Sequence, residues 1–132
     1  MSTAAGHPFR AAIEAGDLDA MEATLAPQVV FHSPAVFKPY AGRETVGALI
    51  RLVAGTFEDF RYTDELQGDG THALVFRARV GDREVEGLDL LRTGDDGLIA
   101  DFTVMIRPLS GLIALAQALG PKVEAAGLKS TT

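Results

Sequence analysis

Asp89 and His32 are the two residues whose side chains could do chemistry and whose positions suggest a place in a cavity. Asp89 lies within residues 87–108, GLDLLRTGDDGLIADFTVMIRP, a pattern that predicts two strands joined by a tight turn. Strand alternation places Asp89 on an apolar face, where burial would raise the pKa of its carboxyl group. A neutral carboxyl group there could donate a hydrogen bond to a ligand oxygen, with Gly87 leaving room for a ligand atom. The alternative is that Asp89 bonds a neighbouring group and serves the fold.

His32 ends the short apolar segment VVFHS and is a candidate general base near neutral pH. The alternative is a histidine on the outer face of the sheet, packed under a helix. Alternation sends His32 and Ser33 to opposite faces, so only one of them can line a cavity. Ser33 has no evident partner base, and its position before Pro34 is typical of a turn.

The remaining polar candidates are weaker. Tyr40 and Tyr62 can each place a hydroxyl group at a pocket rim, although packing of the ring is the alternative. His72 shares the predicted face of Asp89 but lies near a strand end, so we expect it at the surface. The three histidines lack metal-ligand spacing, and there is no cysteine and no glycine-rich phosphate loop. We therefore predict neither a metal nor a cofactor.

Helices and strands that could position these residues follow from periodicity and from glycine, proline and capping residues. Gly16 should end a first helix, and Asp17 should cap a second one, which Pro27 stops. Helices are predicted over residues 8–15, 18–26, 43–55 and about 110–126, and strands over 29–33, 57–67, 71–80, 83–93 and the segment ending at Pro108.

The register of the central hairpin can be predicted from its turn. Gly81-Asp82 is a two-residue hairpin signal, which places Val80 opposite Arg83. Counting outward sets Arg79 against Glu84 and Arg77 against Glu86 on one face, and Leu74 against Asp89 on the other. A slip of one residue would send the apolar set to the wrong face, so the charge match supports this register.

The second turn, residues 94–97, predicts a four-residue connection with Leu91 opposite Ala100 and Asp89 opposite Phe102. The outer face of the sheet then carries several apolar residues among its charges, namely Ala73, Val75, Leu88, Leu90, Thr103 and Met105. Such a face is too apolar for open water, and we expect a homodimer packed through it.

Composition limits the classes of partner. The 132 residues form one domain by length, and their formal charge of −6 argues against nucleic acid or an anionic membrane surface. No apolar run approaches the roughly 20 residues that a membrane span needs. The start, MSTAAGHP, lacks the features of a secretory signal, and the absence of cysteine fits a reducing cytoplasm. We therefore expect a cytoplasmic protein.

The order of elements resembles the nuclear transport factor 2-like superfamily, in its ketosteroid isomerase-like and SnoaL-like branch. The likeness lies in AGDLDAMEATLAPQVVFHSP, YAGRETVGALI and GLDLLRTGDDGLIADFTVMIRP. It implies an α+β fold, a cone-shaped curved antiparallel sheet wrapped around helices, as one domain over residues 1–132. The resemblance also implies a shared role for Asp89 as the protonated acid of the isomerase site. Ser33 stands where that family has its base aspartate, and Phe9 where it has a tyrosine.

Such a cone would enclose an apolar pocket for a small apolar, carbonyl-bearing molecule. The predicted lining is Phe9, Ile13, Phe31, Tyr40, Leu74, Phe76, Leu91, Phe102, Val104 and Ile106. Two functions follow. One is a cofactor-free isomerase, cyclase or dehydratase with Asp89 as the donor and His32 as the base; the other is non-catalytic binding of a similar ligand.

Overall fold

A computed structural model describes residues 6–131, which form four helices and six strands. Within these residues no helix combines the length and apolar character needed to cross a membrane. The elements in chain order are α1 (Pro8–Ala15), α2 (Leu18–Ala23), β1 (Leu25–His32), β2 (Tyr40–Ala41), α3 (Arg43–Thr56), β3 (Glu58–Gln67), β4 (Thr71–Val80), β5 (Arg83–Thr93), β6 (Ile99–Arg107) and α4 (Leu109–Ala125).

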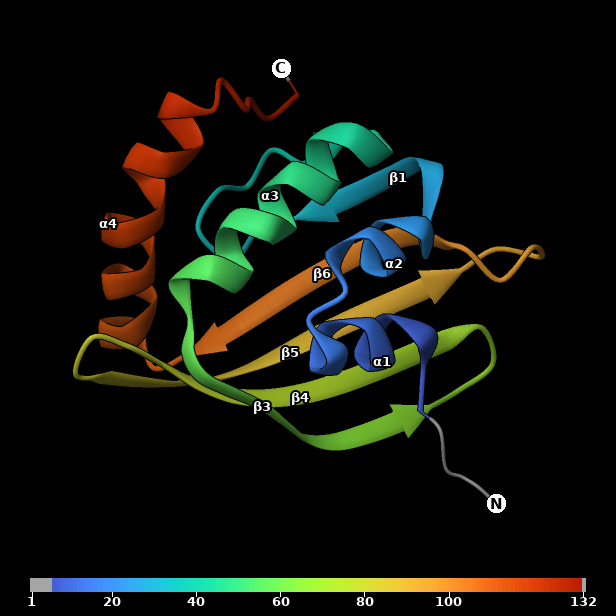
Figure 1. Ribbon diagram of the computed structural model, residues 1–132, viewed down its shortest axis with the longest axis horizontal. Coiled ribbons are helices and arrows are strands. Elements are labelled where there is room, and N and C mark those ends of the chain that lie inside the picture. The colour runs from blue at the N-terminus through green and yellow to red at the C-terminus, as the bar shows by residue number, and fades with distance from the viewer. Residues whose placement is uncertain (1–5, 132) are drawn as a thin grey trace.

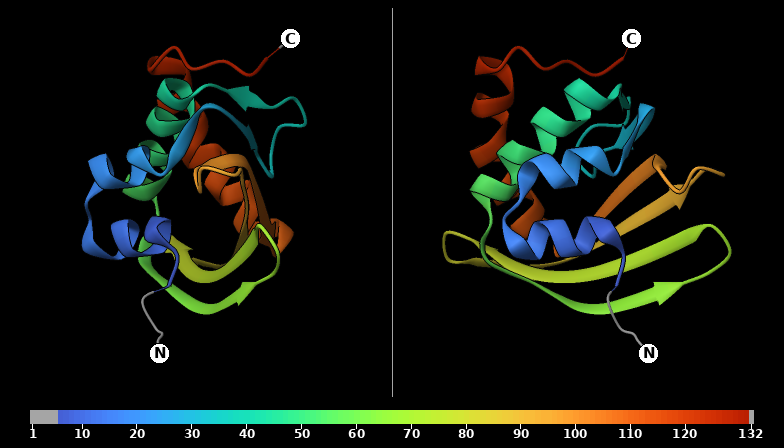
Figure 2. Two further views of the ribbon diagram at one scale, coloured as in Figure 1. Left: turned by 90° about the vertical axis from the view of Figure 1, so that its right-hand side faces the viewer. Right: turned by 45° about the vertical axis from the view of Figure 1, so that its right-hand side comes forward.

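The strands form one curved sheet in the order β2-β1-β6-β5-β4-β3. Helices α1, α2 and α3 lie over its concave side, and α4 stands across one end (Figure 1, Figure 2). This arrangement confirms the predicted α+β cone. One pairing differs from the antiparallel expectation, because β1 runs parallel to β6.

The first turns of the chain fold as their capping residues predict. Gly16 ends α1 in the left-handed region, with a φ of 70°, which glycine adopts at little cost. The carboxylate of Asp17 then accepts a hydrogen bond from the backbone N–H of Ala20 at 3.0 Å, which caps α2. These two caps orient α1 and α2 as an antiparallel pair at the edge of the concave side (Figure 1).

The predicted end of the second helix is wrong. Helix α2 stops at Ala23, and Leu25 and Ala26 are buried residues of β1. Leu18, Met21 and Leu25 fit an apolar helical face, but Leu25 instead pairs with Ile99 of β6. Tyr40 and Ala41, which lie between the predicted strand 29–33 and the predicted helix 43–55, form β2 by pairing with β1. Both differences come from pairing between distant segments, which local periodicity does not report.

The β4–β5 hairpin has the predicted register in full, from Val80 opposite Arg83 to Leu74 opposite Asp89. Arg77 forms the predicted ion pair with Glu86, at 3.3 Å. Arg79 lies opposite Glu84 as predicted, but its guanidinium group forms ion pairs with two acids of β3, Glu58 and Asp59, at 3.2 and 2.8 Å. These pairs are partly exposed, so the apolar inner face contributes more to the register than they do.

The β5–β6 register differs from the prediction by two residues. Leu91 pairs with Phe102, and Asp89 pairs with Val104. The ladder shifts between Arg92 and Thr93, so the connection is longer than the four residues that the turn sequence indicates. A shift of two leaves every side chain on its predicted face, since alternation has a period of two.

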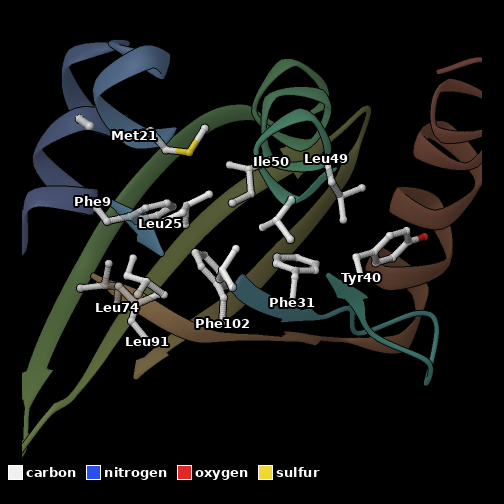
Figure 3. Close-up of a cluster of buried hydrophobic side chains, with 14 of the residues drawn as sticks. Phe9, Met21, Leu25, Phe31, Tyr40, Leu49, Ile50, Leu74, Leu91 and Phe102 are labelled. Carbon is white, nitrogen blue, oxygen red and sulfur yellow. The ribbon is translucent and has the colours of Figure 1, made fainter. Parts of the chain in front are cut away.

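The hydrophobic core lies where α1, α2 and α3 meet the sheet. In Figure 3, side chains from α1, β1 and β6 converge, with Phe9, Phe31 and Phe102 packed together. The ring centroids of Phe9 and Phe102 are 5.1 Å apart, and those of Phe31 and Phe102 are 5.2 Å apart. This cluster joins α1 to the sheet, and Phe9, Phe31 and Phe102 also line a cavity.

Gly87 makes room for an aromatic ring rather than for a ligand atom. A Cβ atom added to Gly87 would overlap the ring of Phe76. That ring is 1% exposed and stacks on Phe60 with centroids 5.0 Å apart, so it cannot easily move aside. The expectation that Gly87 leaves space for ligand is therefore wrong.

We predict that Gly87→Ala lowers the free energy of unfolding by about 1–3 kcal/mol, because overpacking displaces the Phe76 ring. Urea denaturation measures this change. Gly120→Ala is the matched control, since nothing lies within 4 Å of its added Cβ and alanine favours a helix. Equal stability of Gly87→Ala and wild type would contradict this account of the packing.

Candidate functional site

A cavity of about 830 Å³ lies between the concave side of the sheet and helices α1, α3 and α4. This volume suits a small organic ligand. The lining is mostly apolar and unusually aromatic: of the chain's seven phenylalanines and two tyrosines, all except Phe37 line it. The cavity therefore favours an apolar molecule with faces that can pack against rings.

Most of the predicted lining residues do line this cavity, namely Phe9, Ile13, Phe31, Tyr40, Phe76, Phe102, Val104 and Ile106, together with Asp89. Leu74 and Leu91 do not, although they share the predicted face. Both are 0% exposed within the hydrophobic cluster that contains Phe9 (Figure 3). Alternation gives the face of a residue but not whether a helix packs over it.

Asp89 projects from β5 and is 7% exposed. Its cross-strand neighbours are Leu74 on β4 and Val104 on β6, both apolar. Burial raises the pKa of Asp89 to about 7, and a hydrogen bond from Tyr62 lowers it in part. At neutral pH the neutral and ionised forms of Asp89 are therefore both populated.

Tyr62 is the polar partner that the sequence did not reveal. Its hydroxyl group donates to Oδ2 of Asp89 at 3.3 Å, from a strand two positions away in the sheet. Burial raises the pKa of Tyr62 well above its usual value, and the negative charges of Asp89 and Glu14 raise it further. Tyr62 is thus a stable donor. Strand β3 has bulges on both sides of Tyr62. Because each bulge shifts the register, the neighbours of Tyr62 could not be predicted by counting residues from a turn.

His32 is not the base of this cavity. It is absent from the lining, and its Nε2 lies 2.9 Å from Oδ1 of Asp101, which the hairpin pattern places on the outer face. Phe31 and Ser33 line the cavity on either side of it, as alternation requires. The hydroxyl of Ser33 accepts a hydrogen bond from the N–H of Ala35 at 3.1 Å, so it forms the expected turn. The structure therefore does not bring His32 into the cavity with Asp89, as the hypothesis of a His32 base and an Asp89 donor requires.

The expectation of a surface position for His72 is also wrong. Its Nδ1 is buried, and its ring centroid lies 4.6 Å from that of His7. In the described part of the chain no group of three or more histidine, cysteine or acidic residues could hold a metal ion. The edge of the cavity includes the charged residues Glu14, Arg51 and Arg61.

The fold and this site define a class of small cone-shaped proteins with an apolar pocket. The family described as SnoaL-like domain matches residues 8–102, and the chain belongs to it, in the SnoaL and ketosteroid isomerase branch of the nuclear transport factor 2-like superfamily. No curated protein matches this chain.

Several solved structures are similar. A steroid delta-isomerase from Pseudomonas aeruginosa is 42% identical, with 89% of this chain and 88% of that chain covered and a TM-score of 0.83. An uncharacterised bacterial protein with a cystatin-like fold from Silicibacter pomeroyi DSS-3 is 32% identical, with 92% and 89% covered and a TM-score of 0.85. A putative ketosteroid isomerase from Kribbella flavida is 18% identical, with 76% and 73% covered and a TM-score of 0.64, and shows the fold alone.

Proposed function

We propose that the cavity binds a small, largely apolar molecule through one acceptor oxygen, such as a carbonyl group, which receives a hydrogen bond from Asp89. The observation that carries this proposal is a buried acid with a pKa near 7 inside an aromatic cavity. A carboxyl group that is neutral at physiological pH can donate to an oxygen without bringing a charge into an apolar site.

Tyr62 supports this role by fixing the acid. Its hydrogen bond engages Oδ2 of Asp89, which leaves Oδ1 as the atom that carries the proton toward the ligand. Most of the remaining lining is apolar and supplies shape and apolar contact. The proposed ligand is accordingly apolar over most of its surface, with its oxygen at the Asp89 end.

A direct test compares two probes of similar shape, 4-androstene-3,17-dione and the hydrocarbon androstane, by equilibrium dialysis. The ketone should bind more tightly than the hydrocarbon, and Tyr62→Phe should weaken ketone binding about fivefold to tenfold. Tyr40→Phe is the matched control, since it removes a hydroxyl from another part of the same cavity. Equal binding of ketone and hydrocarbon would overturn the proposal.

We propose proton transfer on the bound ligand as a second candidate function. It is favoured by the 42% identity to a protein described as a steroid delta-isomerase, over 89% of this chain. Among the described cavity residues, Glu14 is the carboxyl group other than Asp89. In this reaction Glu14 takes a proton from the carbon between the carbonyl and the double bond and returns it to the far carbon of the original double bond, which moves the double bond into conjugation with the carbonyl. Asp89 meanwhile donates to the carbonyl oxygen.

The assay for this candidate uses 5-androstene-3,17-dione, whose conversion to the conjugated ketone raises ultraviolet absorbance. Glu14→Gln should slow the conversion about a hundredfold and leave binding of 4-androstene-3,17-dione unchanged. Glu44→Gln, on the exposed side of α3, is the control. Binding of the ketone without any conversion by wild type would exclude this candidate and retain the first.

We also propose a homodimer through the outer face of the sheet. Val75, Leu88 and Met105 border a groove of about 360 Å³ on this face, and the side chain of Met105 is 52% exposed. We predict a dimer in sedimentation at micromolar concentration and a monomer for Met105→Lys, which would place a charge in the apolar contact. Phe37→Lys, in the loop after β1, is the control and should remain dimeric. A wild-type monomer would contradict the proposed assembly.

A further inference from the structure

We propose that His7, packed against His72, forms a pH-sensitive latch that holds the start of α1 against the sheet and releases it when His7 becomes protonated. The latch lies outside the Asp89 site, between the N-terminus of α1 and the hairpin of β3 and β4. Its opening is a property of the fold and does not depend on the proposed ligand.

The first component of the latch is a cap that requires an uncharged imidazole. His7 is the N-cap of α1, and its Nδ1 accepts the backbone N–H of Phe9 at 2.9 Å. A protonated imidazole carries hydrogen on both nitrogens and cannot accept this bond. Protonation of His7 therefore removes the cap of α1, an eight-residue helix. Loss of an N-cap lowers the stability of a helix.

The second component is the close contact with His72. The two ring centroids are 4.6 Å apart with an interplanar angle of 65°. The Nδ1 of His72 is buried and has no hydrogen-bond partner within the described residues, so no neighbour holds this ring in place through that atom. Two imidazolium groups at this distance would also repel each other.

The other charged groups around the pair are already engaged. Glu65 on β3 accepts the backbone N–H of His7 at 3.0 Å and a guanidinium hydrogen of Arg10 at 3.2 Å. Arg10 also bonds Glu14, and the residue opposite His72 on β5 is the apolar Leu91. Burial is the main cause that lowers the pKa of His7; the charge of His72 lowers it further, and Glu65 opposes both.

The first turn of α1 connects this pair to the cavity. Phe9, Ile13 and Glu14 line the cavity from α1, and α1 lies along the concave side of the sheet (Figure 2). The guanidinium carbon of Arg10 lies 5.5 Å from the centroid of the Tyr62 ring, over its face. Release of this turn would therefore open one wall of the cavity and remove a cation that contacts the partner of Asp89.

The direction of the pH effect follows from the lowered pKa of His7. Its stabilising contribution is present above the usual histidine pKa of 6.5 and is lost as the pH falls from 6.5 through the folded-state value. Asp89 acts in the opposite direction, because its pKa is raised. Comparing wild type with a His7 variant at the same pH therefore separates the effect of His7 from that of Asp89.

Amide hydrogen exchange of wild type and His7→Asn tests the latch, because asparagine caps a helix without titrating. At about pH 5, α1 amides should exchange about tenfold faster in wild type than in His7→Asn; at about pH 7.5 the two should match. The amides of α3 should not differ, and His32→Asn should behave as wild type. Equal α1 exchange at both pH values would overturn the proposal.

A second variant keeps the test decisive if His7→Asn disturbs the helix. His72→Leu removes the neighbour that lowers the pKa of His7, so the closed state tolerates protonation of His7 better and α1 should open at a lower pH than in wild type. NMR titration of the His7 ring in wild type gives the same answer directly. A midpoint for His7 at or above 6.5 would contradict the latch, whether or not any ligand binds.

Discussion

Asp89→Leu should abolish measurable affinity for 4-androstene-3,17-dione, whereas Asp89→Asn should retain most of it. Leucine removes the buried donor and leaves the ligand oxygen without a partner, at a cost that is large in an apolar cavity. Asparagine keeps an N–H donor of similar shape at the same position. Isothermal titration at about pH 6, where the wild-type acid is mainly neutral, measures both affinities.

Stability provides the control for this comparison. At about pH 8 the wild-type carboxyl is ionised in a buried site, so Asp89→Leu should be at least as stable as wild type. The unpaired hydroxyl of Tyr62 opposes this gain, and Tyr62→Phe in the same variant should restore it. A loss of about 3 kcal/mol in Asp89→Leu that Tyr62→Phe does not restore would mean that Asp89 serves the fold.

The second large effect is the pH dependence of stability. The pKa of Asp89 rises from 3.8 in the unfolded chain to about 7 in the folded protein, so between these values the folded protein binds more protons. The contribution of Asp89 to stability is therefore greatest below pH 3.8, falls as the pH rises toward 7, and is constant above it. The total loss is on the order of 4 kcal/mol, from about three units at about 1.4 kcal/mol each.

Urea denaturation across this pH range measures the effect as the difference between wild type and Asp89→Asn. The difference should change by the stated amount between about pH 4 and pH 7, because asparagine does not titrate. Asp95→Asn, at an exposed turn position, should leave the profile unchanged. A difference that is independent of pH would show that Asp89 is ionised throughout and cannot be the proposed donor.

The fold and the position of Asp89 on the apolar face were predictable from local features. The Gly81-Asp82 turn, the alternation of β4 and β5 and the facing charges determined the hairpin register and the face on which Asp89 lies. The raised pKa of Asp89 followed from that apolar face, because desolvation depends on the surroundings and not on one specific partner.

The partners of the polar side chains were decided only by the tertiary structure. Tyr62 on β3 donates a hydrogen bond to Asp89 on β5, and the bulges of β3 prevent this contact from being predicted by counting residues from the turns. His32 contacts Asp101 because β1 pairs in parallel with β6. The same pairing ended α2 before Leu25, whose spacing fits a helix. Alternation and turn chemistry act between neighbours in sequence. Contacts between distant segments depend instead on bulges, strand order and helix packing, so the same local pattern is compatible with several arrangements.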